Sequence, residues 1–183
     1  MMVVLTGASG SGKTTLCQRV VAALKARGRD VAGVLTLPRC ANGRAAKIGM
    51  EVEDARTGER FALAERAAVG AGTANLGWKF DAAGLARGVQ ILCAATPCDV
   101  LIVDELGPLE LLRNEGWMVA LDVLRAENYR AALVVVRPSL LENFRARLES
   151  DMQVLTITPI NREGLFKPIV EMLEARTSAH PYE

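Results

Sequence analysis

Aromatic residues, histidine and long apolar stretches are all scarce in this chain of 183 residues. Only 4% of the residues are aromatic although 50% are hydrophobic, so aliphatic side chains and alanine must build most of the core. A core of that kind is typical of helices packed on a sheet. The length suits one globular domain, and we expect residues 1–183 to form it without a linker.

No apolar run approaches the roughly 18 residues that a membrane-spanning helix needs. The apolar start, Met1 to Leu5, is too short for the core of a signal peptide and has no basic residues before it. The sequence therefore predicts a cytoplasmic protein with no membrane partner.

Excess charge of either sign is also lacking, since the formal net charge is +1 and the pI is near 7.7. This balance gives no reason to expect a nucleic acid as partner. Residues 1–45, however, hold seven basic residues and a single acid, Asp30. We expect that local excess either to form a solvated helix face or to help attract a polyphosphate.

The four cysteines form no CxxC pair, and the single histidine is at position 180. These ligands are too few and too badly spaced for a structural zinc site. Each cysteine lies in or beside an apolar run, which predicts a buried, reduced thiol at Cys17, Cys40, Cys93 and Cys98.

Short apolar runs alternate with helical patterns along most of the chain. Apolar runs at residues 3–5, 31–35, 100–103 and 133–136 predict buried strands, and residues 154–157 predict the last strand. Helical spacing of apolar residues recurs between most of these runs. This alternation predicts an α/β fold in which helices cover both faces of a mostly parallel central sheet, a three-layer sandwich.

Two segments depart from that alternation. Residues 47–64 alternate apolar with polar side chains on either side of a Gly-containing turn, which predicts a β-hairpin insert with one solvated face. Residues 66–80 are rich in glycine and alanine, and we expect them to form a loop with little regular structure.

Capping residues predict three helix boundaries. Gly28 is typical of the position just after a helix, and Asp81 is typical of an N-cap. Ser139 with Glu142 has the spacing of a capping box, in which two side chains satisfy the first free N–H groups of a helix.

The segment GASGSGKT, from Gly7 to Thr14, matches the P-loop pattern GxxxxGK[ST] in full. Glycines let backbone N–H groups converge on phosphate oxygens, and the helix that follows adds the positive end of its dipole. Lys13 can reach the β- and γ-phosphates, and the Thr14 hydroxyl can ligate Mg²⁺. The sequence therefore predicts a nucleoside-triphosphate site that comprises Gly7, Ala8, Ser9, Gly10, Ser11, Gly12, Lys13, Thr14 and Thr15.

A pair of acids follows the apolar run at residues 100–103. The carboxyl end of a buried parallel strand lies in the crevice where such folds bind ligands. We expect Asp104 to hold Mg²⁺ or its waters, as a Walker B acid does, and Glu105 to orient or deprotonate an attacking water. Glu110 is a further candidate, equally consistent with a surface residue.

Four segments together resemble a known family. They are GASGSGKTT at 7–15, GVLTLPR at 33–39 leading into IGMEVEDARTGER at 48–60, VDELGPLEL at 103–111, and TPINRE at 158–163. In this order they resemble the small P-loop nucleoside-triphosphatases first described in thermophiles, also called the cancer-related nucleoside-triphosphatase family. Three positions depart from the family pattern: Arg39 stands where an acid is usual, and Pro108-Leu109 stands where Lys-Met is usual.

The resemblance implies a Rossmann-like P-loop fold and Mg²⁺-dependent hydrolysis of ATP, GTP and other nucleoside triphosphates to the diphosphate and phosphate. It also implies that Asn161 and Arg162 lie near the base or ribose, although Asn161 is equally suited to cap the final helix. Arg137, at the end of a predicted strand, is placed to contact a base or a phosphate, or to remain a surface residue. The resemblance assigns no role to residues 77–80.

Two other classes of function remain open. A small-molecule or nucleotide kinase would need an acceptor pocket and usually a mobile, Arg-rich lid. A nucleotide-dependent switch or accessory protein would use the hairpin at 47–64 as a surface for a protein partner. The acids Asp104 and Glu105 favour hydrolysis over both. The sequence lacks an [NT]KxD motif that would demand guanine, so ATP and GTP are both expected substrates.

Overall fold

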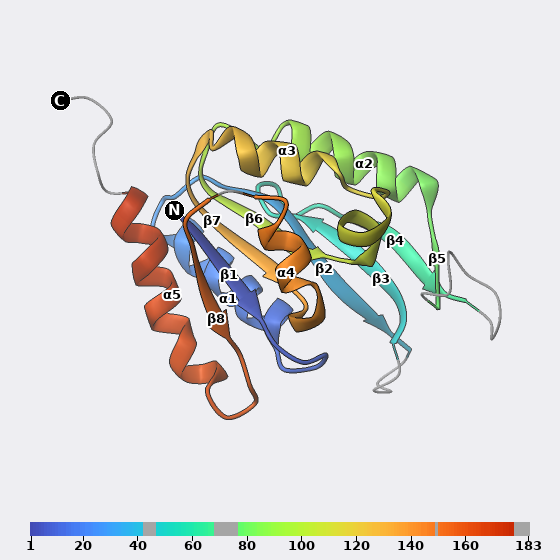
Figure 1. Ribbon diagram of the computed structural model, residues 1–183, viewed down its shortest axis with the longest axis horizontal. Coiled ribbons are helices and arrows are strands. Elements are labelled where there is room, and N and C mark those ends of the chain that lie inside the picture. Colours follow the sequence, from blue (N-terminus) through green and yellow to red (C-terminus); the bar gives the residue numbers. More distant parts are fainter. Residues whose placement is uncertain (42–46, 68–76, 149, 178–183) are drawn as a thin grey trace.

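The computed structural model describes residues 1–41, 47–67, 77–148 and 150–177. One sheet runs through them with the strand order β5-β4-β3-β2-β6-β7-β1-β8 (Figure 1). Neighbouring strands from β2 to β8 in this order are parallel, and β3, β4 and β5 extend the sheet with antiparallel pairs. The strands are β1 (Met2–Thr6), β2 (Val31–Cys40), β3 (Lys47–Asp54), β4 (Arg60–Arg66), β5 (Trp78–Phe80), β6 (Cys98–Leu106), β7 (Tyr129–Val136) and β8 (Met152–Thr156).

Helices cover both faces of this sheet. Alternate residues of β1 show the two layers, because Val3 and Leu5 pack with α1 and α5 whereas Met2 and Val4 pack with the layer of α2, α3 and α4. Figure 1 shows the same division, which confirms the predicted three-layer α/β fold. The helices are α1 (Lys13–Ala26), α2 (Ala82–Cys93), α3 (Val119–Ala126), α4 (Leu141–Arg145) and α5 (Arg162–Thr177). Within the described ranges, no helix has the length and apolar character needed to cross a bilayer.

The predicted hairpin forms as β3 and β4, and it belongs to the main sheet. β2 is longer than predicted: it continues to Cys40 and pairs with β3 from Val34 onward. The predicted loop at 66–80 is partly wrong, because β4 extends to Arg66 and residues 78–80 form β5 against it. Trp78 and Phe80 flank Lys79 with the period of two that marks a strand. Residues 68–76 lie outside the described residues.

Two of the three predicted helix boundaries are confirmed. The Asp81 side chain accepts a hydrogen bond from the Gly84 N–H at 2.8 Å, and Gly28 follows α1 with a φ of +75°. The capping box at Ser139 is wrong. Pro138, with its fixed φ, starts a short 3₁₀ turn, η3 (Pro138–Leu140), and α4 begins after it without a side-chain cap.

The prediction for the cysteines is half confirmed. Cys17 and Cys98 are buried, but Cys40 and Cys93 are exposed, and all four are free thiols. Cys40 ends β2 where that strand leaves the core, and Cys93 is the last residue of α2. An apolar neighbourhood in sequence was therefore not enough to bury Cys40 and Cys93.

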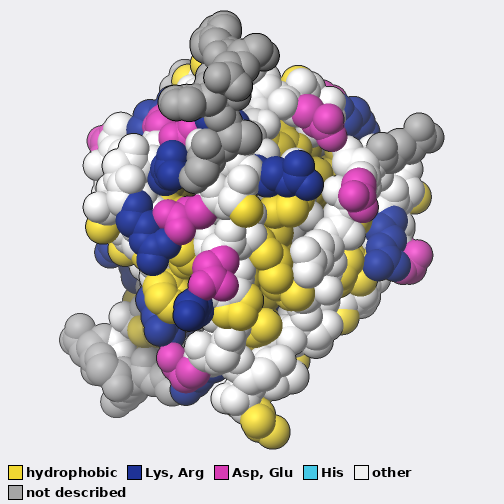
Figure 2. Space-filling view, turned by 90° about the vertical axis from the view of Figure 1, so that its left-hand side faces the viewer, with side chains coloured by type: hydrophobic (Ala, Val, Ile, Leu, Met, Phe, Trp, Pro, Cys, Tyr) yellow, Lys and Arg dark blue, Asp and Glu magenta, His cyan; other side chains and the backbone are white. Residues whose placement is uncertain are grey.

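Part of the basic excess of residues 1–45 is paired with acids from distant segments. Arg19 on α1 and Arg27, the C-cap residue directly after it, form ion pairs with Glu163 and Glu174 on α5, the first at 2.8 Å. Figure 2 shows the side of the molecule on which α5 lies, where positive and negative side chains are interspersed around apolar ones. These pairs join the two helices of one layer.

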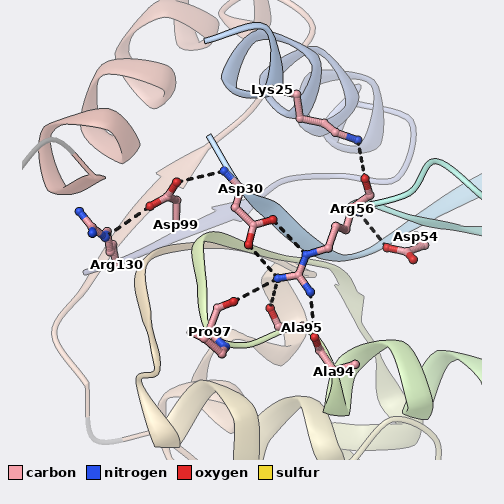
Figure 3. A network of polar contacts seen from close by, with 9 residues as sticks. All are labelled: Lys25, Asp30, Asp54, Arg56, Ala94, Ala95, Pro97, Asp99 and Arg130. Carbon is pink, nitrogen blue, oxygen red and sulfur yellow. Dashed lines mark hydrogen bonds and ion pairs between the residues drawn. The ribbon is translucent and has the colours of Figure 1, made fainter. Parts of the chain in front are cut away.

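Arg56, in the turn between β3 and β4, ties the hairpin to the end of the sheet remote from the P-loop (Figure 3). Its guanidinium binds both carboxylate oxygens of Asp30, at 3.0 and 2.9 Å. It also donates to the carbonyl oxygens of Ala94, Ala95 and Pro97 at 2.9 to 3.1 Å. One planar side chain thus joins the hairpin, the start of β2 and the segment before β6.

We predict that Arg56→Lys lowers the free energy of unfolding by about 2 kcal/mol, because an ammonium cannot reproduce the forked contacts of a guanidinium. Arg60→Lys is the matched control, since Arg60 lies in the same hairpin and forms an exposed pair with Glu53. The control should change stability by less than about 0.5 kcal/mol. Urea denaturation followed by circular dichroism measures both, and equal effects would contradict the tethering role of Arg56.

Candidate functional site

The loop between β1 and α1 has the backbone that its glycines predict. Gly10 and Gly12 have φ values of +79° and +100°, which side chains other than glycine rarely adopt. Gly12 is the N-cap of α1, and its carbonyl accepts the first helical hydrogen bond from Leu16 at 2.9 Å. The first N–H groups of α1 therefore lie at the end of the loop, as an anion site requires.

Lys13 is held inside this loop. Its Nζ donates to the carbonyl oxygens of Gly7 and Ala8, both at 2.8 Å, and only 9% of the residue is exposed. Burial lowers the pKa of Lys13, while the nearby carboxylates of Glu105 and Asp104 act to raise it. The ammonium thus lies within electrostatic reach of both acids that follow the apolar part of β6.

Asp104 is completely buried near the end of β6. Its Oδ2 accepts a hydrogen bond from the Thr36 N–H at 3.3 Å, and its backbone carbonyl accepts one from the Thr36 hydroxyl at 2.5 Å. Burial, together with the charge of Glu105, raises the pKa of Asp104 to about 7, against the opposing effects of Thr14, Thr36 and Lys13. Among the residues that the structure describes, none donates a hydrogen bond to Oδ1 of Asp104.

Glu105 occupies an irregular position in β6. The pairing with β7 shifts between Asp104 and Leu106, so Glu105 is the extra residue of a β-bulge. Bulges re-aim side chains near the ends of strands. The carboxylate of Glu105 is 28% exposed and pairs with Arg137 at the end of β7, with 2.5 Å between Oε1 and Nε. Arg137 therefore forms an ion pair with the acid that we expect to orient or deprotonate the attacking water.

Glu110 stabilises the chain behind Glu105. It lies in the π-helical turn η2 (Leu109–Arg113) and is 6% exposed. Its carboxylate accepts hydrogen bonds from the N–H groups of Gly107 and Trp117, at 3.0 and 2.9 Å. Burial raises the pKa of Glu110. Its burial shows that the surface alternative for Glu110 is wrong, and its contacts fix the loop.

Asn161 and Arg162 lie on the other side of the P-loop. Asn161 Oδ1 accepts from the Thr158 N–H at 2.8 Å, so the side chain bonds backward into its own turn rather than forward into α5. Arg162 begins α5, and its Cδ lies 3.5 Å from the position that a Cβ on Gly12 would occupy. The structure therefore brings Arg162 against the loop, while the Asn161 side chain bonds within its own turn.

Thr36 was missed when the sequence was considered alone. It contacts Asp104 twice, and it lies in β2, whose parallel neighbour is β6. The signal that could have found it is a polar residue directly after the apolar run of the second strand, since adjacent parallel strands end at the same edge of a sheet.

Thr14 and Asp104 have the donor chemistry that Mg²⁺ prefers, a hydroxyl and a carboxylate with a free oxygen. Oδ1 of Asp104 is buried and has no hydrogen-bond partner among the described residues. A bound cation would offset the cost of burying this charge. Within the described ranges, no three His, Cys, Asp or Glu residues gather to bind a metal by themselves. Such a sparse site suits Mg²⁺, which usually keeps water and phosphate ligands.

Comparison with known proteins matches residues 2–170 to the model of the NTPase family. The chain belongs to that family. Among its relatives, the nucleoside-triphosphatase THEP1 of Methanopyrus kandleri is 34% identical over 176 residues, which cover 92% of this chain and 93% of the relative. The nucleoside-triphosphatase THEP1 of Thermococcus kodakarensis is 31% identical, with 93% of each chain covered.

Solved structures show the same fold for this NTPase. A human cancer-related nucleoside triphosphatase superposes with a TM-score of 0.72 at 26% identity, covering 95% of this chain and 97% of the other. THEP1 from Aquifex aeolicus superposes with a TM-score of 0.69 at 20% identity, over 95% and 99% of the two chains. The family resemblance drawn from four sequence segments is thereby confirmed, as is the P-loop fold.

We predict that the metal-free protein loses stability as the pH rises from about 4 towards 7. The folded pKa of Asp104 is raised, so the folded state keeps a proton that the unfolded state releases in this window. The loss from this one group is at most about 1.4 kcal/mol per pH unit. Urea midpoints of wild type and Asp104→Asn in the presence of EDTA measure it. The Asn variant should show a flatter pH dependence, and parallel curves would contradict the assignment.

Proposed function

We propose that this chain is a Mg²⁺-dependent nucleoside triphosphatase that releases the γ-phosphate of ATP, GTP and related nucleotides. The observation that carries this proposal is that the two acids near the end of β6 lie at the same edge of the sheet as the P-loop that follows β1, with β7 between the two strands. A P-loop alone would serve any phosphate-binding protein, whereas a second carboxylate beside the metal ligand supplies a group that can act on water. The names of the relatives support the same activity.

The P-loop and Lys13 would hold the triphosphate. Backbone N–H groups at the start of α1 would donate to the phosphate oxygens, and Lys13 would exchange the carbonyl oxygens of Gly7 and Ala8 for phosphate oxygens. Thr14 and Asp104 would hold Mg²⁺, which supplies charge neutralisation to the transferring phosphoryl group. Both effects are stronger here than in water because Lys13 and Asp104 are buried.

Glu105 would orient and deprotonate the attacking water. Its carboxylate is partly exposed and is re-aimed by the bulge, so water can reach it. Arg137 binds that carboxylate through its Nε and would keep it oriented. The contact with Glu105 supports a role for Arg137 near the γ-phosphate in preference to a contact with the base.

The base and ribose would lie on the opposite side of the P-loop, near Arg162. Arg162 is half exposed and lies against Gly12, and its guanidinium is suited to stack on a flat ring. Asn161 would support the turn that carries Arg162 through its bonds to the Thr158 and Thr156 backbone.

The cytoplasmic location stays a prediction.

We predict that Glu105→Gln lowers the rate of phosphate release by about 100-fold or more, because the amide cannot accept the proton of water. Nucleotide binding should remain, since Glu105 is not part of the P-loop. Lys13→Ala should lose both binding and release. Phosphate release measured with Mg²⁺ and a panel of nucleotides, together with calorimetric binding, separates these outcomes.

Glu142→Gln is the matched control, because Glu142 is an exposed acid on α4 that pairs only with Arg145 among the residues described. It should behave as wild type. Unchanged turnover in Glu105→Gln would remove Glu105 from the mechanism. Phosphate release by wild type that does not exceed that of Lys13→Ala would contradict the hydrolase as a whole.

A further inference from the structure

A pocket with apolar walls lies beside Glu105, on the side of β6 that is remote from the P-loop strand. Glu105, Arg137 and Thr36 line one end of it. Its walls come from the antiparallel extension of the sheet and from the segments that cover it, and they include Met50, Leu63, Trp78, Phe80, Leu85 and Trp117. Figure 1 shows that this extension, β3 to β5, lies at the far end of the sheet from β1.

Hydrolysis of a nucleotide does not need such walls. A water molecule requires only polar neighbours, whereas concave, mostly apolar pockets with a few polar groups are typical of sites for organic molecules. The pocket shares Glu105 and Arg137 with the site of the proposed reaction. An organic molecule in the pocket would therefore present one end to the carboxylate that we expect to act on the nucleophile.

The walls are fixed in place by their own contacts. The Trp117 indole N–H donates to the Leu85 carbonyl at 3.1 Å, and Trp117 packs so closely on Gly88 that a Cβ there would lie 2.4 Å from it. Glu110 holds the N–H groups of Gly107 and Trp117. A pocket that is already ordered without its ligand favours binding, because few side chains lose conformational freedom when the ligand binds.

The chemistry of the lining defines the occupant. Two tryptophans and a phenylalanine favour a flat aromatic ring, which packs on such side chains by offset or edge-to-face stacking. The carboxylate of Glu110 is already bonded to two backbone N–H groups, which leaves Glu105 as the acid best placed to accept a proton at the polar end. A hydroxyl group is the natural donor to that acid.

We propose that this pocket binds a small aromatic alcohol and that the enzyme transfers the γ-phosphoryl group to its hydroxyl. The alcohol oxygen forms a bond to the γ-phosphorus, and the bond from the γ-phosphorus to the β,γ-bridging oxygen breaks. The hydroxyl proton passes to the Glu105 carboxylate and from there to water. The products are a phosphate monoester and the nucleoside diphosphate. The proposal rests on the proposed function, because it uses the same nucleotide site and the same carboxylate.

Binding can be followed directly, since Trp78 and Trp117 line the pocket and the chain has two tryptophans. Benzyl alcohol is the probe, and toluene is its matched partner without the hydroxyl. Both should change the tryptophan fluorescence of the wild type in a saturable way. A change that stays linear with concentration for both probes would overturn the pocket as a binding site.

Transfer is measured by ³¹P NMR of the wild type with ATP, Mg²⁺ and millimolar benzyl alcohol. Benzyl phosphate should appear beside inorganic phosphate, and it should be absent with toluene. Phe80→Ala and Met50→Ala, which remove two separate walls, should each lower the ratio of ester to inorganic phosphate by about tenfold. Phe61→Ala is the control, since Phe61 is a half-buried phenylalanine of β4 that contacts Arg87 and does not line the pocket.

The two proposals fail in different ways. Inorganic phosphate without any ester, despite saturable binding of benzyl alcohol, would overturn the acceptor role and leave the hydrolase standing. Absence of phosphate release in the wild type without alcohol would contradict the proposed function itself. An equal loss of ester in Phe61→Ala and Phe80→Ala would also overturn the assignment of the pocket.

Discussion

Asp104 is a carboxylate buried completely in the sheet, with one oxygen that none of the described residues satisfies. A charge in that position is costly unless a cation accompanies it. Much of the surrounding structure is arranged to meet this constraint. Thr36 bonds to it from the neighbouring strand, Thr14 adds a hydroxyl, and the charge of Lys13, held in the P-loop, acts to stabilise the carboxylate. In the absence of a cation the carboxylate takes up a proton more readily, as its raised pKa shows.

Sheet order explains why these groups meet. β7 lies between the P-loop strand β1 and the acidic strand β6, so the site spans three adjacent strand ends and Arg137 on β7 falls between the two halves. The antiparallel extension beyond β2 has a different consequence. It places aromatic side chains beside Glu105, so one carboxylate faces both the phosphate site and an apolar pocket. Hydrolysis and transfer would then differ only in which hydroxyl compound reaches Glu105.

Local patterns were enough to predict much of the fold and the phosphate site. The P-loop could be recognised because its backbone conformation requires glycine at particular positions. Apolar runs identified the parallel strands correctly. The sequence also identified the position of Asp104, because a carboxylate directly after a buried parallel strand lies at the ligand-binding edge of the sheet. The hairpin was predicted from its period of two. These features depend on interactions between residues close in sequence.

Features that depend on distant residues could not be predicted in the same way. The bond from Thr36 to Asp104 joins residues 68 positions apart, and the pair of Glu105 with Arg137 depends on a bulge that the pattern does not reveal. Strand β5 was not predicted, because its three residues follow a Gly- and Ala-rich stretch and are too few to establish the alternation of side chains that marks a strand. The capping box failed because Pro138 started a different turn first.

The central claim is that Lys13, Asp104 and Glu105 act on the same γ-phosphate. A crystal structure with Mg²⁺ and a non-hydrolysable ATP analogue tests it most directly. We expect Lys13 to leave the loop carbonyl oxygens for the phosphates, Mg²⁺ to lie between Thr14 and the Asp104 carboxylate, and a water to lie between Glu105 and the γ-phosphorus. A metal held without Asp104, or a γ-phosphate that points away from Glu105 towards Arg162, would contradict it.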